Sequence, residues 1–87
     1  MQYVEDYYET LFTKHKLRPP VSYESDLLIT KDAMLNWLKK IKMSETYWSK
    51  FLDTSIDEYI TNNPRRKLWA FAGEALDIKE NPGAFKQ

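Results

Sequence analysis

The stretch from Thr30 to Leu52 constrains the fold of this chain more than any other part of the sequence. Its first half repeats apolar residues at the i, i+3, i+4 and i+7 spacing of one helix face, namely Met34, Trp37, Leu38 and Ile41. Thr30 lies where an N-cap hydroxyl is expected, and Ser44 offers a second cap. After Ser44, the inward positions are Tyr47, Trp48, Phe51 and Leu52, and the outward positions are Glu45, Thr46, Ser49 and Lys50. The stretch predicts two short helices joined by a tight turn, which is the outline of a helix-turn-helix.

Residues 1–16 predict a helix that precedes this stretch. Apolar side chains keep helical spacing there, and acidic residues near the start and basic residues near the end match the helix dipole. The helix ends before Pro19-Pro20, because proline disfavours the helical conformation at the residue before it. Residues 17–29 form a connector, which we expect to be mostly extended; the alternative is a helix capped by Ser25-Asp26 that runs on into the central stretch.

Residues 53–81 predict two further helices. Ser55 and Glu58 fit the S-x-x-E capping box, so a short helix is expected as far as Thr61. Asn63-Pro64 is a good start for the last helix, since asparagine suits the cap and proline the first turn. The last helix ends before Pro82, and residues 82–87 form a tail.

The start at Asn63-Pro64 has one feature against it. It places Arg65, Arg66 and Lys67 in the first turn, where the helix dipole disfavours each cation by about 0.3 to 1 kcal/mol. One explanation is that the helix begins later, near Trp69, and that residues 57–68 form a short β-hairpin. The other is that the three cations serve an anionic partner.

Length and composition favour one domain, residues 1–87, with a mainly α fold: a small helical domain with a central helix-turn-helix.

The chain has no cysteine and a single histidine, His15, which leaves little for a zinc site. Two glycines cannot build a phosphate-binding loop, and signatures of nucleophilic catalysis are missing. No run approaches the ~20 apolar residues of a membrane span, and residues 1–10 do not resemble a signal peptide. We expect a cytoplasmic protein that is not an enzyme and needs no metal or cofactor.

The aromatic residues must supply much of the core. Phe, Trp and Tyr make up 15% of the chain, and the three tryptophans share helix faces with aliphatic neighbours, which favours core packing over a platform for stacking bases. So many aromatics exceed what a small core hides. We therefore expect some at the surface, where a homodimer partner or a ligand could cover them.

The charge distribution points to duplex DNA as a partner. The net charge is zero, which argues against nonspecific nucleic-acid binding, yet residues 30–52 carry five basic and two acidic groups. We predict that the outer face of the second central helix enters the major groove. The expected groove contacts are Thr46, Ser49 and Lys50. The expected phosphate contacts are Lys39, Lys40, Lys42, Arg65, Arg66 and Lys67.

Two features weaken the DNA prediction. The turn Lys42-Met43-Ser44 lacks the glycine that is frequent there, and the second helix has no arginine. One alternative is a helix bundle with solvated lysines. Another is a protein that binds and inhibits or redirects a host protein through an acidic, aromatic face of the N-terminal helix. That face would consist of Tyr3, Glu5, Asp6, Tyr7 and Glu9.

A resemblance to one protein family rests on two short motifs. They are Leu38-x-x-Ile41-x-x-Ser44-x-x-Tyr47-Trp48 and, after a gap, Trp69-x-Phe71-Ala72. Over about residues 30–81 the chain resembles small excisionase-like proteins of unknown function from phages and prophages of Gram-positive bacteria. The family usually has a glycine-containing wing before the tryptophan, whereas residues 56–67 contain no glycine. The resemblance implies a DNA-binding or regulatory protein of a phage or mobile element.

Overall fold

A computed structural model describes residues 4–22 and 25–85, without the side chains of residues 4, 5, 84 and 85. The helices are α1 (Val4–Lys14), α2 (Lys31–Lys40), α3 (Glu45–Leu52), α4 (Ile56–Asn62), α5 (Leu68–Glu80) and the 3-10 helix η1 (Pro82–Phe85). The described ranges contain no β-strand. The prediction of a mainly α fold is therefore confirmed.

The first residues of three helices are fixed by hydroxyl caps at the predicted positions. The Oγ1 atom of Thr30 accepts a hydrogen bond from the amide of Ala33 at 3.2 Å, which starts α2. Ser44 caps α3 in the same way, and Ser55 caps α4 by accepting from the amide of Glu58 at 3.1 Å. Since these bonds are local, the sequence alone was sufficient to predict these three starts.

The last helix starts later than Asn63-Pro64. α5 begins at Leu68, so the cations at positions 65–67 precede it and do not oppose its dipole. The β-hairpin that was the alternative over residues 57–68 is not formed in the described structure, because residues 57–62 belong to α4 and a turn follows them. The later helix start of the first explanation is therefore confirmed and its hairpin is wrong, while the anionic partner of the second explanation stays a prediction.

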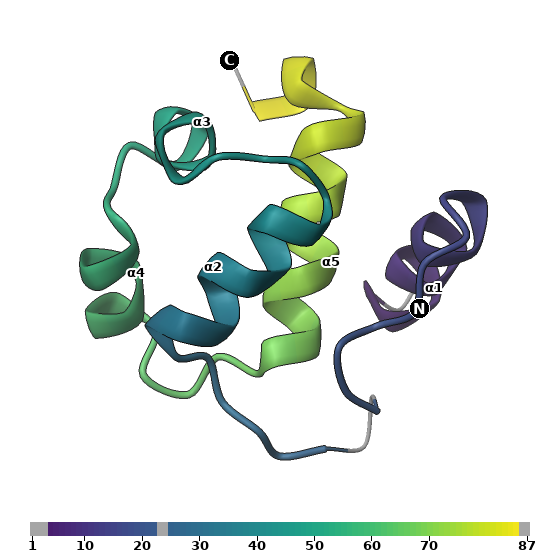
Figure 1. Cartoon of the computed structure of the whole chain (residues 1–87), viewed down its shortest axis with the longest axis horizontal. Coiled ribbons are helices and arrows are strands. Elements are labelled where there is room, and N and C mark those ends of the chain that lie inside the picture. The colour runs from purple at the N-terminus through teal and green to yellow at the C-terminus, as the bar shows by residue number, and fades with distance from the viewer. Residues whose placement is uncertain (1–3, 23–24, 86–87) are drawn as a thin grey trace.

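The helices pack around α5, which lies near the centre of the molecule (Figure 1). α2 packs against it, α1 lies on one side, and α3 and α4 lie on the other (Figure 1). The buried indole of Trp37 on α2 donates a hydrogen bond to the carbonyl of Ala72 on α5 at 3.2 Å. Trp48 packs edge-on against Phe71, with ring centroids 5.3 Å apart. All three tryptophans are buried, which confirms their prediction as core residues.

One predicted core position is wrong. Tyr47 is 37% exposed, and its ring packs edge-on against the half-buried Phe51 at the rim of α3. α3 has only two turns, and it buries Trp48 completely while its neighbours remain partly in solvent. A prediction from spacing alone extended the apolar face by one residue too many.

The described part of the connector contains no helix at Ser25-Asp26, and its residues 27–29 are extended. Leu28 forms an isolated antiparallel bridge with Lys67. Two backbone hydrogen bonds hold it, from the amide of Ile29 to the carbonyl of Arg66 and from the amide of Leu68 to the carbonyl of Leu27, both 2.9 Å long. This bridge fixes the connector to the start of α5.

α1 contacts α5 more extensively than any other helix does, and the contact depends on a glycine. The ring of Tyr8 lies so close to Gly73 that a Cβ atom at that position would be 2.2 Å from Cγ and Cδ2 of the tyrosine. Only a residue without a side chain fits beneath this ring. Gly73 therefore sets the distance between the two helices.

Polar contacts hold both ends of α1 to α5. Near the start of α1, the hydroxyl of Tyr7 donates to Asp77 at 2.5 Å. At its end, Lys14 and His15 contact the carboxylate of Glu80 at 2.5 and 2.7 Å. The hydrogen bonds from these two side chains lower the pKa of Glu80 below its usual value. The position of α1 is thus specified by contacts at both of its ends.

We expect the Gly73→Ala substitution to destabilise the protein. The gain in helix propensity is about 1 kcal/mol, but overpacking against Tyr8 typically costs about 1 to 3 kcal/mol and occasionally more. A lower denaturation midpoint in urea would show the loss. Gly83→Ala is the control, since a Cβ there meets nothing within 4 Å; equal midpoints for both variants would contradict the close contact.

We expect Glu80→Gln to change the acid dependence of stability. A carboxyl with a lowered pKa contributes stability above its unfolded pKa, and the protein loses this contribution as the pH falls through the folded pKa. The melting temperature of the variant should therefore lie below that of the wild type at neutral pH, and the two should converge well below pH 4.5. Glu9→Gln, at an exposed carboxylate, should show no such convergence. A constant difference for Glu80→Gln at all pH values would exclude the contact.

Candidate nucleic-acid interface

The turn between α2 and α3 has a left-handed residue at its centre. Four residues, 41–44, join the helices, and Lys42 has φ 60°. The amide of Met43 donates to the carbonyl of Leu38 at 2.8 Å, and the amide of Lys42 donates to the carbonyl of Lys39 at 3.1 Å. This pattern is a Schellman motif, whose left-handed position usually holds glycine. Lys42 takes the conformation that the missing glycine would have supplied.

Cations from two separate elements meet at this turn. Lys39, Lys40 and Lys42 are exposed and have no carboxylate partner in the part of the chain that the structure describes. Lys79 of α5 donates a hydrogen bond to the carbonyl of Ile41, at the end of α2. It therefore brings a further ammonium group to the turn. Sequence analysis missed Lys79, because its position in the last turn of α5 does not indicate which helix lies beside it.

A hollow of about 480 Å³ lies beside these cations. Its lining residues are Lys42, Met43, Ser44, Tyr47 and Lys79. Two ammonium groups and a phenol hydroxyl can all donate hydrogen bonds to a phosphate oxygen. The exposure of Tyr47, which contradicts its predicted core position, thus gives this hollow an aromatic wall.

The outer face of α3 is polar and mostly exposed. Thr46 and Lys50 are exposed, whereas Ser49 is half-buried, so two of the three predicted groove contacts are fully accessible. Glu45 is exposed on the same helix and places a negative charge in its first turn. Lys50 has no carboxylate partner within the described ranges. This face presents hydrogen-bonding groups with one positive and one negative charge.

The remaining predicted phosphate contacts lie elsewhere. The turn meets the C-terminal end of α5, whereas residues 65–67 precede its N-terminal end. A helix of 13 residues spans roughly 20 Å, so the structure separates the two basic sets by about that distance. Arg66 pairs with Glu74 at 3.0 Å and Lys67 pairs with Asp26 at 3.5 Å. Of this set, Arg65 alone is exposed without a carboxylate partner among the described residues.

Glu74 is the centre of a half-buried polar cluster at the start of α5. It accepts hydrogen bonds from Arg66 and, at 2.5 Å, from the hydroxyl of Tyr59 on α4. Burial and this bond raise the pKa of Tyr59 above its usual value. The hydroxyl of Tyr59 thus holds α4 to α5, and the charge of the Arg66 guanidinium is largely neutralised by Glu74.

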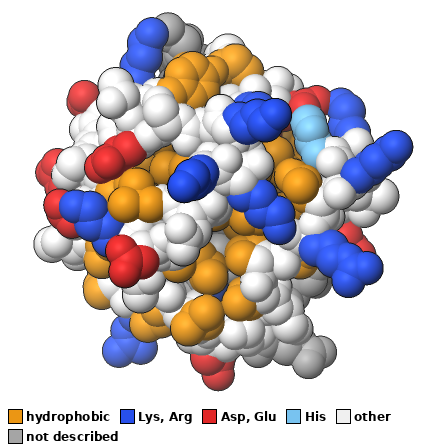
Figure 2. All heavy atoms as spheres, viewed as in Figure 1, with side chains coloured by type: hydrophobic (Ala, Val, Ile, Leu, Met, Phe, Trp, Pro, Cys, Tyr) orange, Lys and Arg blue, Asp and Glu red, His pale blue; other side chains and the backbone are white. Residues whose placement is uncertain are grey.

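The basic surface extends beyond the turn. In Figure 2, Lys and Arg side chains cross the centre of the visible face and continue to its right-hand side, beside the histidine, His15. The ammonium of Lys40 lies 5.7 Å from the ring centroid of Trp37 on α2. Acidic side chains lie mostly toward the left of this face (Figure 2). A chain without net charge thus has an uneven distribution of charge over its surface.

The predicted protein-binding face on α1 is only partly available. Tyr3 and the side chain of Glu5 lie outside the described structure. Tyr7 is exposed, but its hydroxyl is bonded to Asp77, and this hydrogen bond raises the pKa of Tyr7 to about 12. Asp6 and Glu9 are exposed.

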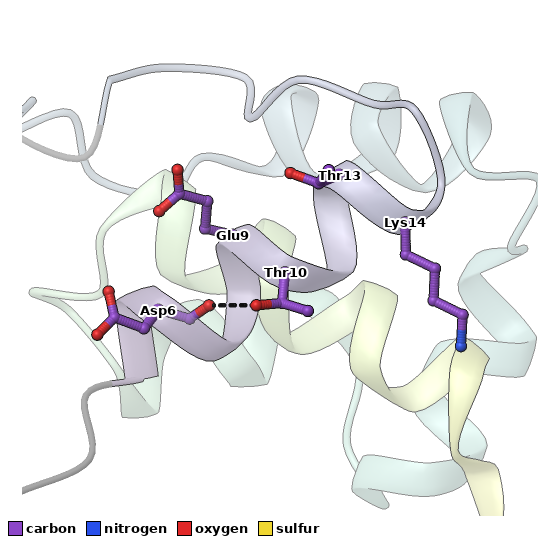
Figure 3. Close-up of a pocket in the computed structure, with 5 residues that line it drawn as sticks. All are labelled: Asp6, Glu9, Thr10, Thr13 and Lys14. Atoms are coloured by element: carbon purple, nitrogen blue, oxygen red, sulfur yellow. Dashed lines mark hydrogen bonds between the residues drawn. The ribbon is translucent and has the colours of Figure 1, made fainter.

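A shallow hollow of about 680 Å³ lies along the same flank of α1 (Figure 3). All of its lining residues come from α1, namely Asp6, Glu9, Thr10, Thr13 and Lys14. Because a single helix lines it, the hollow is an open flank of α1. It therefore lacks the opposing wall of a typical ligand pocket.

Neither a metal centre nor a membrane helix emerges from the described residues. No three histidine or acidic side chains among residues 4–22 and 25–85 are grouped so that they could hold a metal ion. No helix within these ranges has the length and apolar character needed to cross a bilayer. Comparisons of the chain with protein-family models, with curated proteins and with solved structures found no match. The candidate interface is therefore defined by its geometry alone.

We expect Lys42→Gly to stabilise the protein. A left-handed conformation costs a residue with a Cβ about 1 to 2 kcal/mol, and glycine avoids this cost. Glycine is also more flexible in the unfolded state, and the conformational entropy that it loses on folding costs about 0.5 to 1 kcal/mol. The net gain should be about 0.5 to 1 kcal/mol, measured by urea denaturation. Lys39→Gly is the control, because this helical position should lose about 1 kcal/mol. A loss for both variants would contradict the left-handed turn.

Proposed function

We propose that this chain is a small DNA-binding protein in which α2 and α3 form a helix-turn-helix and α3 is the recognition helix. The observation that carries the proposal is the hollow beside the turn, where Lys42, Lys79 and Tyr47 converge next to the start of α3. A phosphate of the DNA backbone suits this hollow by charge and by hydrogen bonding. The four-residue turn has the length typical of a helix-turn-helix, and its left-handed residue answers the objection that glycine is absent.

In this mechanism, phosphate contacts fix the position of α3 in the major groove. Lys42 and Lys79 anchor one phosphate at the hollow, and Lys39 and Lys40 contact the neighbouring backbone. Thr46, Ser49 and Lys50 then face the base edges. Lys50 can donate to the acceptor atoms of guanine or to thymine O4, and the hydroxyl groups can bond to any base. The absence of arginine on α3 favours modest discrimination between bases.

Residues 65–67 have a secondary role in this proposal. They lie about 20 Å from the hollow, so they could contact only a more distant part of the same duplex. Arg66 and Lys67 would have to leave their carboxylate partners to do so. Arg65 is the member of this set that is ready for a phosphate contact. The wing of the resembling family has no counterpart among the described residues, so DNA binding would depend on α3 and the turn.

The resemblance to excisionase-like proteins suggests the setting of this activity. Under the proposal, the protein acts in the cytoplasm on duplex DNA of a phage or mobile element, in excision or in regulation. Small proteins of this kind need high affinity for a few sites and little for bulk DNA, since nonspecific sites compete for them. A neutral net charge with a local basic surface suits that requirement.

A second candidate is recognition of a basic host protein by α1. Asp6 and Glu9 on its exposed flank have no cationic partner among the described residues, which leaves two carboxylates free for such a contact. Asp6→Lys with Glu9→Lys should abolish this activity and leave DNA binding intact. Lys42→Ala with Lys50→Ala should do the reverse, so the two pairs of substitutions separate the candidates.

We expect the affinity for a fluorescent duplex to fall steeply with salt, with a slope of about −0.9 in log K against log salt for each phosphate contacted. The probe is a duplex selected by the protein from a random-sequence pool, compared with the unselected pool. Lys42→Ala should weaken binding to both and reduce the slope by about 1, because it removes a phosphate contact. Lys50→Ala should weaken binding to the selected duplex more than to the pool. The measurement is fluorescence anisotropy over a salt series.

Lys31→Ala is the matched control for these variants. Lys31 is an exposed lysine on α2, but it lies at the opposite end of the helix from the turn and pairs with Asp57. Its loss should leave both affinity and slope nearly unchanged. Selection that enriches no duplex, or binding that is independent of salt, would overturn the proposed function.

A further inference from the structure

Among the described residues, the part of the connector next to α2 has a free backbone edge at Leu28. Figure 1 shows residues 25–29 passing along the rim of the molecule before α2. Leu28 and Lys67 are paired in an antiparallel bridge, and the hydrogen bonds come from the residues on either side of Leu28. Leu28 is therefore in a non-hydrogen-bonded pair, in which its own N–H and C=O point away from Lys67. Neither group has a hydrogen-bond partner among residues 4–22 and 25–85.

The same edge is apolar. Leu27 is 50% exposed and Leu28 is 40% exposed, and they are the only two aliphatic residues among the large exposed hydrophobics of the described structure. They project to opposite faces of the extended segment, because side chains alternate along it. An unpaired backbone edge with exposed aliphatic side chains is a template for pairing with another strand.

The sequence of this segment is complementary to itself. Only the backbone groups of Leu28 are directed outward. The carbonyl of Leu27 and the amide of Ile29 are bonded to residues 68 and 66, and the amide of Leu27 is bonded to the Ser25 hydroxyl. A two-fold axis at Leu28 then pairs Leu28 with Leu28, Leu27 with Ile29, and Asp26 with Thr30. The exposed Leu28 side chains meet each other, each Leu27 lies opposite Ile29, whose side chain is buried in its own core, and each Asp26 lies opposite Thr30. No like charges face each other, which is the arrangement that cross-strand pairing favours.

We propose that the partner of this edge is a second copy of the chain, bound by antiparallel pairing of residues 26–30 across a two-fold axis at Leu28. The two Leu28 residues exchange two N–H···O=C hydrogen bonds, and their side chains lie beside each other. A partner of unrelated sequence would need a matching acid, hydroxyl and apolar pattern, whereas a second copy has it in the reverse direction. Because the paired segment is short, the dimer should be weak and dependent on concentration.

The inference does not depend on DNA binding, because it concerns a different surface. The edge lies at the start of α5, and the hollow beside the turn lies at its end. A dimer of this kind would present two copies of α3, as proteins that bind two half-sites do. All measurements below are made without DNA, so their failure would leave the proposed function untouched.

Cysteine cross-linking tests the pairing directly, since the natural chain has no cysteine. The Cα atoms of a hydrogen-bonded antiparallel pair are about 5.5 Å apart, which is a usual distance for a disulfide. Leu28→Cys should therefore form a covalent dimer rapidly under mild oxidation, seen on a non-reducing gel. Tyr47→Cys is the matched control, because its site is 37% exposed, close to the 40% of Leu28, and lies outside the paired segment. Equal cross-linking of the two variants would overturn the proposal.

A charge pair tests the two-fold axis. Leu28→Lys and Leu28→Glu should each weaken dimerisation by about 10-fold or more, because like charges then face each other across the axis. A mixture of the two variants should form a heterodimer, because opposite charges now meet. Sedimentation over a concentration series measures the wild type, the two variants and their mixture, and circular dichroism confirms that each variant is folded. A wild type that stays monomeric throughout, or a mixture no more associated than its components, would disprove the dimer.

Discussion

The rest of the structure depends on the burial of α5. Eight of its 13 residues are buried, and they cover the helix surface except for one face, where Ala70, Glu74 and Asp77 are half-buried. Small residues at positions 72, 73 and 75 let neighbouring helices approach closely, while Phe71 and Leu76 fill the space between them. A buried face this wide lets several neighbouring helices pack against α5 at once. This helix is the scaffold on which the short helices, each too short to be stable alone, are assembled.

How much the sequence predicts depends on how local the deciding interaction is. The starts of α2, α3 and α4 follow from hydroxyl caps that act over three residues, and sequence analysis located all three. The start of α5 has no side-chain cap. It is set by two tertiary contacts. The bridge joins it to residues 27–29, which are distant in the chain, and Arg66 in the preceding turn contacts Glu74 on α5. Asn63-Pro64 has the local features of a helix start, but these tertiary contacts override it.

The same distinction applies to the candidate interface. Lys39, Lys40 and Lys42 could be predicted from the sequence as members of the candidate interface, because they lie at the end of one predicted helix and in the turn after it. The contribution of Lys79 could not, because it depends on the end of α5 meeting the end of α2. Tyr47 occupied an apparently apolar position, and only the shortness of α3 leaves it exposed. Residues 65–67 seemed to belong to the same surface, but the length of α5 separates them from it.

The left-handed conformation of Lys42 is not by itself a sign of function. Lys16 and Lys42 both have positive φ, and each occupies the same position of a Schellman motif, after α1 and after α2. A strained position can indicate function, but here the chain uses lysine twice where glycine is usual. Strain at Lys42 is therefore a property of how these helices end. What distinguishes Lys42 from Lys16 is its surroundings, since Lys42 shares a hollow with Lys79 and Tyr47 at the start of another helix. The case for DNA binding thus depends on this convergence of groups, because neither the conformation of one lysine nor the total charge would support it alone.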